Sequence, residues 1–114
     1  YRDEALRLLS ATRGKEDVPR ASMAWDEKRE PEDSLPFLDA LEAVLRDMMR
    51  VMNGLEPFDA QIADNLEDIA QHFTIDAVAC IMEEAVSVRK RVNAHVQWRS
   101  AAEPLLLKIV EGAK

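Results

Sequence analysis

The sequence predicts an all-α domain, a compact bundle of five to six helices. Apolar residues recur three and four positions apart through most of the 114 residues, a spacing that places them on one face of a helix. No segment shows the period of two that a half-buried strand requires. The glycines stand where helices are expected to stop, which leaves none for a phosphate-binding loop: Gly14, Gly54 and Gly112.

The front half of the chain contains three predicted helices. A short amphipathic helix is expected over residues 2–12, and a second, with weaker spacing, over about residues 19–29. Ser34 is the expected N-cap of a long third helix, which contains Pro36 in its first turn. The pair Asn53-Gly54 is expected to end that helix.

The back half is organised around two helices that share one joint. A helix over residues 59–72 comes first. Thr74 then caps a long helix from residue 75 to about residue 95, and the last helix covers residues 97–110 with Pro104 inside it. Each of the last two has an apolar stripe, so we expect them to pack against each other. The expected inward residues are Ile75, Val78, Ile81, Met82, Ala85, Val88, Val92 and Val96, and then Trp98, Ala101, Ala102, Leu105, Leu106 and Ile109.

The charge of the chain is unevenly distributed. Fifteen basic and 22 acidic residues give a net charge of −7, but the residues from Val88 onward carry +4 and the preceding ones −11. An acidic body argues against this domain as the main contact with nucleic acid, because phosphate binding depends on Lys and Arg. The basic end contains cations that stabilise helix C-termini, or it forms a patch for an acidic partner; the first interpretation is favoured.

Cysteine content and hydropathy exclude other classes of protein. The single cysteine, Cys80, allows neither an intramolecular disulfide nor a cysteine-based zinc site. No apolar run reaches the roughly 18 residues of a membrane helix and no signal peptide is visible, so we expect no membrane partner and a cytoplasmic location. Because the chain starts at Tyr1, without Met and within a helical pattern, we expect it to be the C-terminal piece of a longer protein.

Residues typical of catalysis do not converge in the sequence. His72 and His95 lie at opposite ends of one helical hairpin, and neither belongs to a Glu-x-x-His pair, the pattern of a di-metal bundle. Adjacent acids such as Glu83 and Glu84 point about 100° apart on a helix, so they do not converge on one ligand. We therefore expect no catalytic, cofactor or metal site in this chain.

Two runs of the sequence resemble the delta-prime subunit family of bacterial DNA polymerase III. The run AHVQWRSAAEPLLLKI, residues 94–109, is similar to the family's C-terminal signature, in which a joint precedes an apolar helix with Glu before Leu-Leu-Leu-Lys. Leu45-Arg46-Asp47 is similar to the Arg-Asp of the family's long front helix, and the order of helices also fits. His95, Gln97 and Pro104 depart from the family's pattern, which usually has Asn at the joint.

The resemblance covers essentially the whole chain and implies that residues 1–114 form a collar domain, which oligomerises in a clamp loader. The family's AAA+ module precedes this domain. Collar domains of five subunits pack into a ring, which holds the AAA+ modules while ATP binding opens the sliding clamp for DNA replication. The implied partners are other loader subunits (delta and gamma/tau), and DNA and the clamp are contacted only indirectly.

The parent assembly implied by the resemblance is the DNA polymerase III holoenzyme, a DNA-directed DNA polymerase, whereas this domain is not itself an enzyme. The nearest alternative is the collar domain of a delta or gamma/tau subunit, because those subunits end in similar helices. Two alternatives belong to other classes. One is a helical enzyme with inward carboxylates that bind a metal, and the other is an adaptor that binds an amphipathic helix in a groove lined by Met and Leu.

Candidate interface residues flank the main apolar stripes. An arginine is a good anchor because its planar head binds carboxylates while its stem packs. For the Met and Trp residues, an ordinary position in the core is an equal alternative. The candidates are Met48, Met49, Met52, Arg89, Arg91, Trp98 and Leu107.

Overall fold

A computed structural model describes residues 2–11 and 31–112 and confirms the all-α fold. The described residues contain five α-helices and no strand. The helices are α1 Arg2–Ala11, α3 Pro31–Met52, α4 Ala63–Ala70, α5 Ile75–Asn93 and α6 Trp98–Gly112, and a 3-10 turn, η2 Ala60–Ile62, leads into α4. The predicted stop at Gly14 and the predicted helix over residues 19–29 lie outside the described residues.

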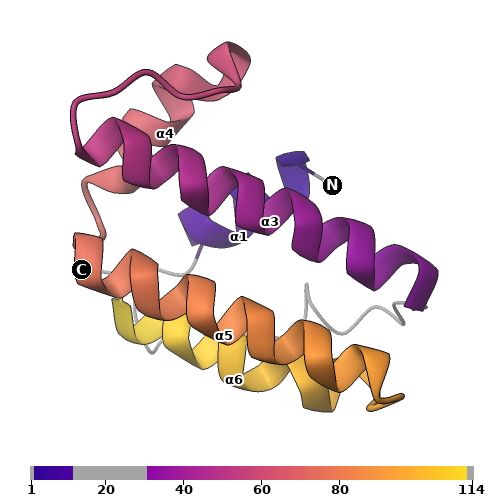
Figure 1. Cartoon of the computed structure of the whole chain (residues 1–114). Coiled ribbons are helices and arrows are strands. Elements are labelled where there is room, and N and C mark those ends of the chain that lie inside the picture. Colours follow the sequence, from indigo (N-terminus) through magenta and orange to yellow (C-terminus); the bar gives the residue numbers. More distant parts are fainter. Residues whose placement is uncertain (1, 12–30, 113–114) are drawn as a thin grey trace.

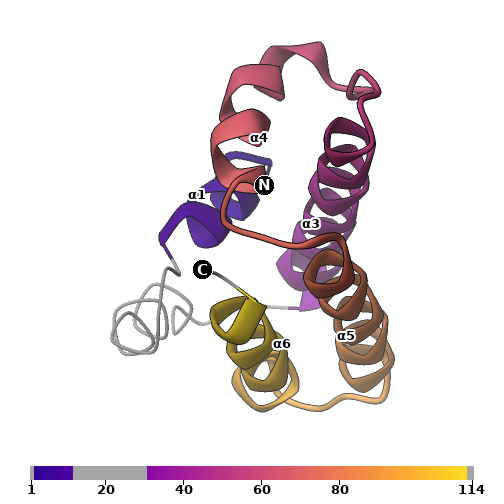
Figure 2. The same cartoon turned by 90° about the vertical axis from the view of Figure 1, so that its left-hand side faces the viewer.

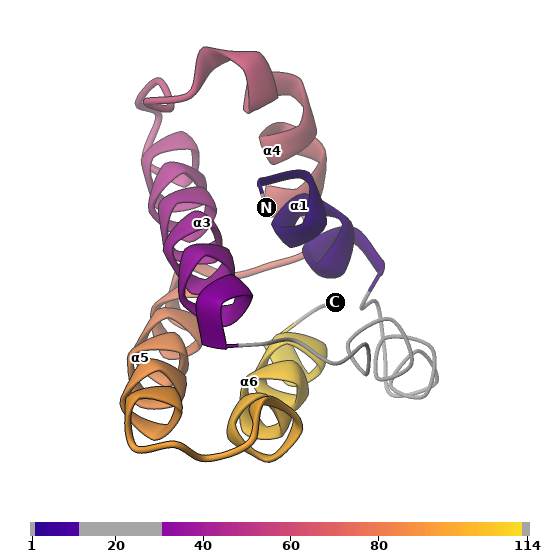
Figure 3. The ribbon, with the colours of Figure 1, turned by 90° about the vertical axis from the view of Figure 1, so that its right-hand side faces the viewer.

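Helix α3 lies at the centre of the arrangement. Helices α1 and α4 pack against α3, α5 runs along another side of it, and α6 lies against α5 (Figures 1 and 2). Seen from the other end, α1 and α4 lie beside α3, and the α5–α6 pair lies below them (Figure 3). The contact between α5 and α6 is the most extensive between any two described helices, so the predicted pairing of the last two helices is confirmed.

The core forms where the apolar faces of these helices meet. Helix α3 contributes six fully or almost fully buried side chains: Phe37, Leu38, Leu41, Val44, Leu45 and Met48. The six inward residues predicted for α6 are all buried. On α5 the buried residues are Val78, Ile81, Ala85, Val88 and Val92.

Two residues predicted to face inward from the long helix are exposed instead. Ile75 is 44% exposed and Val96 is 40% exposed. Ile75 lies about 100° around the helix axis from the middle of the buried stripe, and Val96 lies in the turn after the helix has ended. Ile75 belongs to an apolar arc that is wider than the part of α5 covered by α3 and α6. Val96 would continue the buried stripe only if the helix extended to it.

The start of α3 differs from the prediction. The helix begins at Pro31, so Ser34 lies in the first turn rather than at the N-cap, and Pro36 lies inside the helix. The first four N–H groups of a helix have no intrahelical acceptor, so a proline at the first position loses no hydrogen bond. Pro36 removes only one bond, because later N–H groups continue the ladder.

The C-terminus of α3 agrees with the prediction from Asn53-Gly54. Gly54 has a φ of 77°, in the left-handed region. Its N–H donates to the carbonyl of Val51 at 3.0 Å, and the N–H of Leu55 donates to the carbonyl of Arg50 at 2.8 Å. This pair of bonds is the Schellman motif, which satisfies carbonyls at the helix end.

Helix α5 begins as predicted, because the Thr74 hydroxyl at its N-cap accepts from the N–H of Ala77 at 3.1 Å.

Helix α5 ends in the same motif as α3, but without a glycine. The helix ends at Asn93, before the predicted limit near residue 95. His95 then adopts a φ of 65°, and its N–H donates to the carbonyl of Val92 at 3.0 Å. A residue with a Cβ is strained in this conformation by roughly 1 kcal/mol, which explains why the sequence pattern did not indicate the stop.

Gly112 has a different role from the predicted one. It is the last residue of α6 rather than the position after a helix end. A Cβ at this position would lie 3.1 Å from the Cβ of Ala77, at the start of α5. Glycine therefore allows the end of α6 to approach α5 closely.

Candidate functional site

Two of the candidate interface residues near the joint, Arg89 and Arg91, are bound within the chain. The Nη1 atom of Arg91 donates to Glu84 Oε1 and to the carbonyl of Ala101, both at 3.1 Å. The bond to Ala101 ties α5 to the first turn of α6, and the bond to Glu84 lies within α5. Arg91 therefore holds the hairpin together, and its side chain is 37% exposed.

Arg89 makes the corresponding connection between α5 and α3. Its Nη2 atom lies 2.7 Å from Asp39 Oδ1 and 3.1 Å from Glu42 Oε2. Partial burial alone would lower the pKa of the Arg89 guanidinium, but the hydrogen bonds and charges of Asp39 and Glu42 outweigh it, and they raise the pKa above its usual value. Both arginines therefore have carboxylate partners on their own chain, which supports the structural interpretation of these two charges.

The other predicted interface residues divide between core and surface. Met48 is fully buried, and Trp98 is 8% exposed and meets the Phe37 ring edge-to-face, with the ring centroids 5.9 Å apart. Met49 and Met52 are partly buried against the core. Leu107 is 45% exposed on α6.

The seven candidates therefore do not form one continuous surface. They come from α3, α5 and α6, and Met48 and Trp98 contribute to the core of the domain itself. Whether the remaining five meet a neighbouring subunit stays a prediction.

A second apolar stripe on α5 was not separated from the buried one by the sequence pattern. It consists of Ile75, Ala79, Met82 and Val86, and we call it the outer stripe of α5. The spacing of four, three and four residues places these side chains on one face. Ile75 and Val86 are 44% and 47% exposed, and Ala79 and Met82 are half-buried. The outer stripe thus remains accessible after the core has formed.

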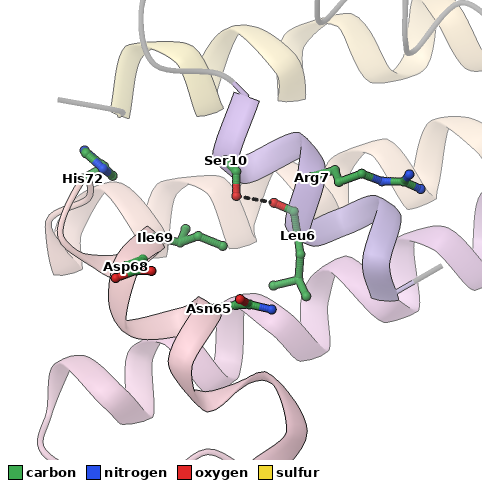
Figure 4. A pocket seen from close by; sticks show the side chains of 7 residues that line it. All are labelled: Leu6, Arg7, Ser10, Asn65, Asp68, Ile69 and His72. Carbon is green, nitrogen blue, oxygen red and sulfur yellow. Dashed lines mark hydrogen bonds between the residues drawn. The ribbon is translucent and has the colours of Figure 1, made fainter.

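An open pocket of about 570 Å³ lies between α1 and α4. Its lining is Leu6, Arg7, Ser10, Asn65, Asp68, Ile69 and His72 (Figure 4). The Ser10 hydroxyl donates to the carbonyl of Leu6 at 2.8 Å, a bond within α1. Arg7 and His72 point away from each other (Figure 4). The pocket therefore does not bring together a nucleophile and an oriented base, the arrangement that covalent catalysis needs.

The described part of the chain contains neither a metal-binding cluster nor a membrane-spanning helix. No group of three or more His, Cys, Asp or Glu side chains in residues 2–11 and 31–112 is placed to hold a metal ion. Within the same ranges, every helix is too short or too polar to span a membrane.

Comparison with known proteins adds no relative. The chain matched no protein-family model, no curated protein and no solved structure.

Proposed function

We propose that this chain is an assembly module, a helical domain that joins a larger complex through protein–protein contacts and has no catalytic role of its own. The observation that carries the proposal is the outer stripe of α5. Helix α5 has two apolar faces, and the fold buries one of them and leaves Ile75 and Val86 of the other 44% and 47% exposed. An apolar helix face that remains accessible favours a partner helix, because covering it removes apolar surface from water.

More narrowly, we propose a collar domain of a clamp-loader subunit of the delta-prime type. The resemblance of residues 94–109 supports this assignment, and the all-α fold is compatible with it. The partners would be the collar domains of delta and gamma/tau subunits, in the cytoplasm. A collar domain of another loader subunit remains the alternative.

Native mass spectrometry tests the proposal. The chain is measured alone and then mixed with the C-terminal domains of the other loader subunits from its organism. A defined hetero-oligomer that forms only in the mixture is the expected result. A mixture in which no complex forms contradicts the collar assignment.

A variant pair tests the surface. Val86→Glu places a charge in the outer stripe of α5 and should weaken the complex by about tenfold or more. Cys80→Glu places the same charge at an exposed position of the same helix, outside the stripe, and should leave the complex intact. Equal effects of the two variants would argue against the outer stripe as the contact surface.

A further inference from the structure

The turn between α3 and η2 exposes two large apolar side chains. Leu55 is 53% exposed and Phe58 is 69% exposed, the highest value for a large apolar residue in the described part of the chain. This turn lies at the opposite end of the bundle from the joint between α5 and α6 (Figure 1). The turn is therefore separate from the joint between α5 and α6.

The exposure of Phe58 is not a consequence of a loosely held loop. The buried carboxylate of Asp47 accepts the N–H of Phe58 at 2.9 Å and the N–H of Asp59 at 3.1 Å. The Nε atom of Arg50 donates to the carbonyl of Glu56 at 2.7 Å. Asp59 in turn accepts from Arg2 of α1 at 2.9 Å. A loop held in this way loses little conformational entropy when it binds a partner.

Two arginines of α3 lie over the exposed ring. The guanidinium carbon of Arg50 is 4.0 Å from the centroid of Phe58, and that of Arg46 is 5.7 Å from it. Among the described residues, neither makes an ion pair with a carboxylate, in contrast to Arg2, Arg89 and Arg91. Their stacking on the ring holds the charged heads beside an apolar surface.

The exposed side chains around the Phe58 ring carry a net positive charge. Arg46 and Arg50 contribute two guanidiniums and Glu56 one exposed carboxylate, while the neighbouring carboxylate of Asp59 is paired with Arg2. Asp47 lies beneath the loop and has both oxygens occupied by backbone N–H groups. We call the set Arg46, Arg50, Leu55 and Phe58 the α3 tip.

We propose that the α3 tip docks an acidic, apolar segment of a partner protein. The arginines would bind carboxylates, with which their planar heads form paired hydrogen bonds, and Leu55 and Phe58 would cover apolar side chains between those carboxylates. Aromatic and arginine residues together are the composition that dominates the binding energy of protein interfaces. A self-complementary pairing of two copies through this surface would place like charges together.

Nucleic acid is the less favourable occupant of the same surface. Stacking of a base on Phe58 with a phosphate on Arg46 is chemically reasonable. The residues before Val88 nevertheless carry a net charge of −11, and this charge repels a polyanion along the rest of its length. A short acidic segment has to meet only the positive α3 tip.

The test uses two short peptides that differ only in charge. Both contain the same leucine and phenylalanine residues, separated by glutamates in one peptide and by lysines in the other. The chain labelled with ¹⁵N is titrated with each peptide, and with a short oligothymidine, while amide chemical shifts are followed. The expected result is saturable binding of the glutamate peptide, with shift changes concentrated at Arg46, Arg50, Leu55 and Phe58.

Variants separate the contribution of the ring from that of the charges. Phe58→Ala should weaken binding of the glutamate peptide by about tenfold or more. The double variant R46E/R50E should lose the glutamate peptide and bind the lysine peptide instead. Val96→Ala, which shortens an exposed apolar side chain in the loop between α5 and α6, is the matched control and should bind the glutamate peptide as the unchanged chain does. Circular dichroism establishes that each variant is folded.

Three outcomes would overturn the proposal. They are tighter binding of oligothymidine than of the glutamate peptide, binding of neither peptide by the folded chain, and binding that Phe58→Ala and R46E/R50E leave unchanged. Because none of them involves the loader subunits, a failure here is distinguishable from a failure of the assembly hypothesis.

Discussion

At the joint between α5 and α6, Arg89 and Arg91 bind acceptors of their own chain, whereas at the α3 tip Arg46 and Arg50 lie over an exposed ring without ion pairs among the described residues. Both ends contain two arginines on one helix. They differ in their neighbours, since carboxylates surround the first pair and an aromatic ring lies beside the second. A basic cluster in a sequence therefore indicates a binding surface only after its internal partners are known.

The two ends also share a backbone motif. Helix α3 and helix α5 both end in a Schellman motif, with Gly54 at the left-handed position of the first and His95 at that of the second. Each end has a polar tether as well. At the α3 tip a buried carboxylate binds backbone N–H groups, and at the joint a guanidinium binds a backbone carbonyl.

The largest expected effect is at the tether of the α3 tip. Asp47→Ala leaves the N–H groups of Phe58 and Asp59 without their acceptor, so the free energy of unfolding should fall by about 3 kcal/mol. Asp47→Asn keeps one acceptor oxygen and should cost less. Urea unfolding followed by circular dichroism measures both. An Ala variant as stable as the unchanged chain would show that Asp47 does not hold the loop.

The second prediction concerns the residue in the left-handed conformation after each of these two helices. His95→Gly should raise the free energy of unfolding by about 1 kcal/mol, because glycine adopts the left-handed conformation without strain. Gly54→Ala should lower it by a similar amount, since a Cβ there meets open space and only the positive φ opposes it. Thermal unfolding measures both variants. If both changed the free energy of unfolding in the same direction, strain at His95 and its absence at Gly54 would be contradicted.

The tether of the joint should contribute less than that of the α3 tip. Arg91→Ala removes the bonds to Glu84 and to the carbonyl of Ala101, and we expect a loss of about 1 kcal/mol, because the side chain is partly exposed and solvent screens the ion pair. Arg91→Lys, which keeps the charge but not the planar head, serves as the control. If Arg91→Ala cost more than Asp47→Ala, the ranking of the two ends would be reversed.

The smallest effect on stability is expected at the surface of the α3 tip. Arg46→Ala should change the free energy of unfolding by less than about 0.5 kcal/mol, because this arginine makes no ion pair among the described residues. The same variant should weaken binding of the glutamate peptide. Chemical denaturation and the peptide titration, made on one sample, separate the two effects. A large loss of stability would mean that Arg46 supports the fold rather than a partner.

Local signals in the sequence predicted much of the fold. Thr74 caps α5 and Gly54 ends α3 as expected, because capping depends on a few adjacent residues. The end of α5 was placed too late because His95 takes a position that usually indicates glycine. Ser34 has the residue type of an N-cap, but α3 begins three residues earlier, at Pro31, where a proline loses no hydrogen bond.

The candidate surfaces were less predictable. The sequence pattern indicated the arginines of the joint and did not indicate Phe58, because an isolated aromatic residue in a turn has no periodicity to reveal its exposure. Its signal was the neighbouring pair Arg46 and Arg50, four residues apart and thus on one face of α3. The arginine pair indicates a binding surface only because the turn after α3 folds back and places Phe58 beside it.

The helical character of the chain, the ends of most helices and the apolar face of each helix follow from the local sequence. Which part of each apolar arc is buried depends on how the helices pack. Val78 and Ile75 belong to the same arc of α5, yet Val78 is fully buried and Ile75 is 44% exposed. The physical reason is that helical periodicity is local, whereas burial depends on where α3 and α6 cross α5, and these contacts join residues far apart in the chain.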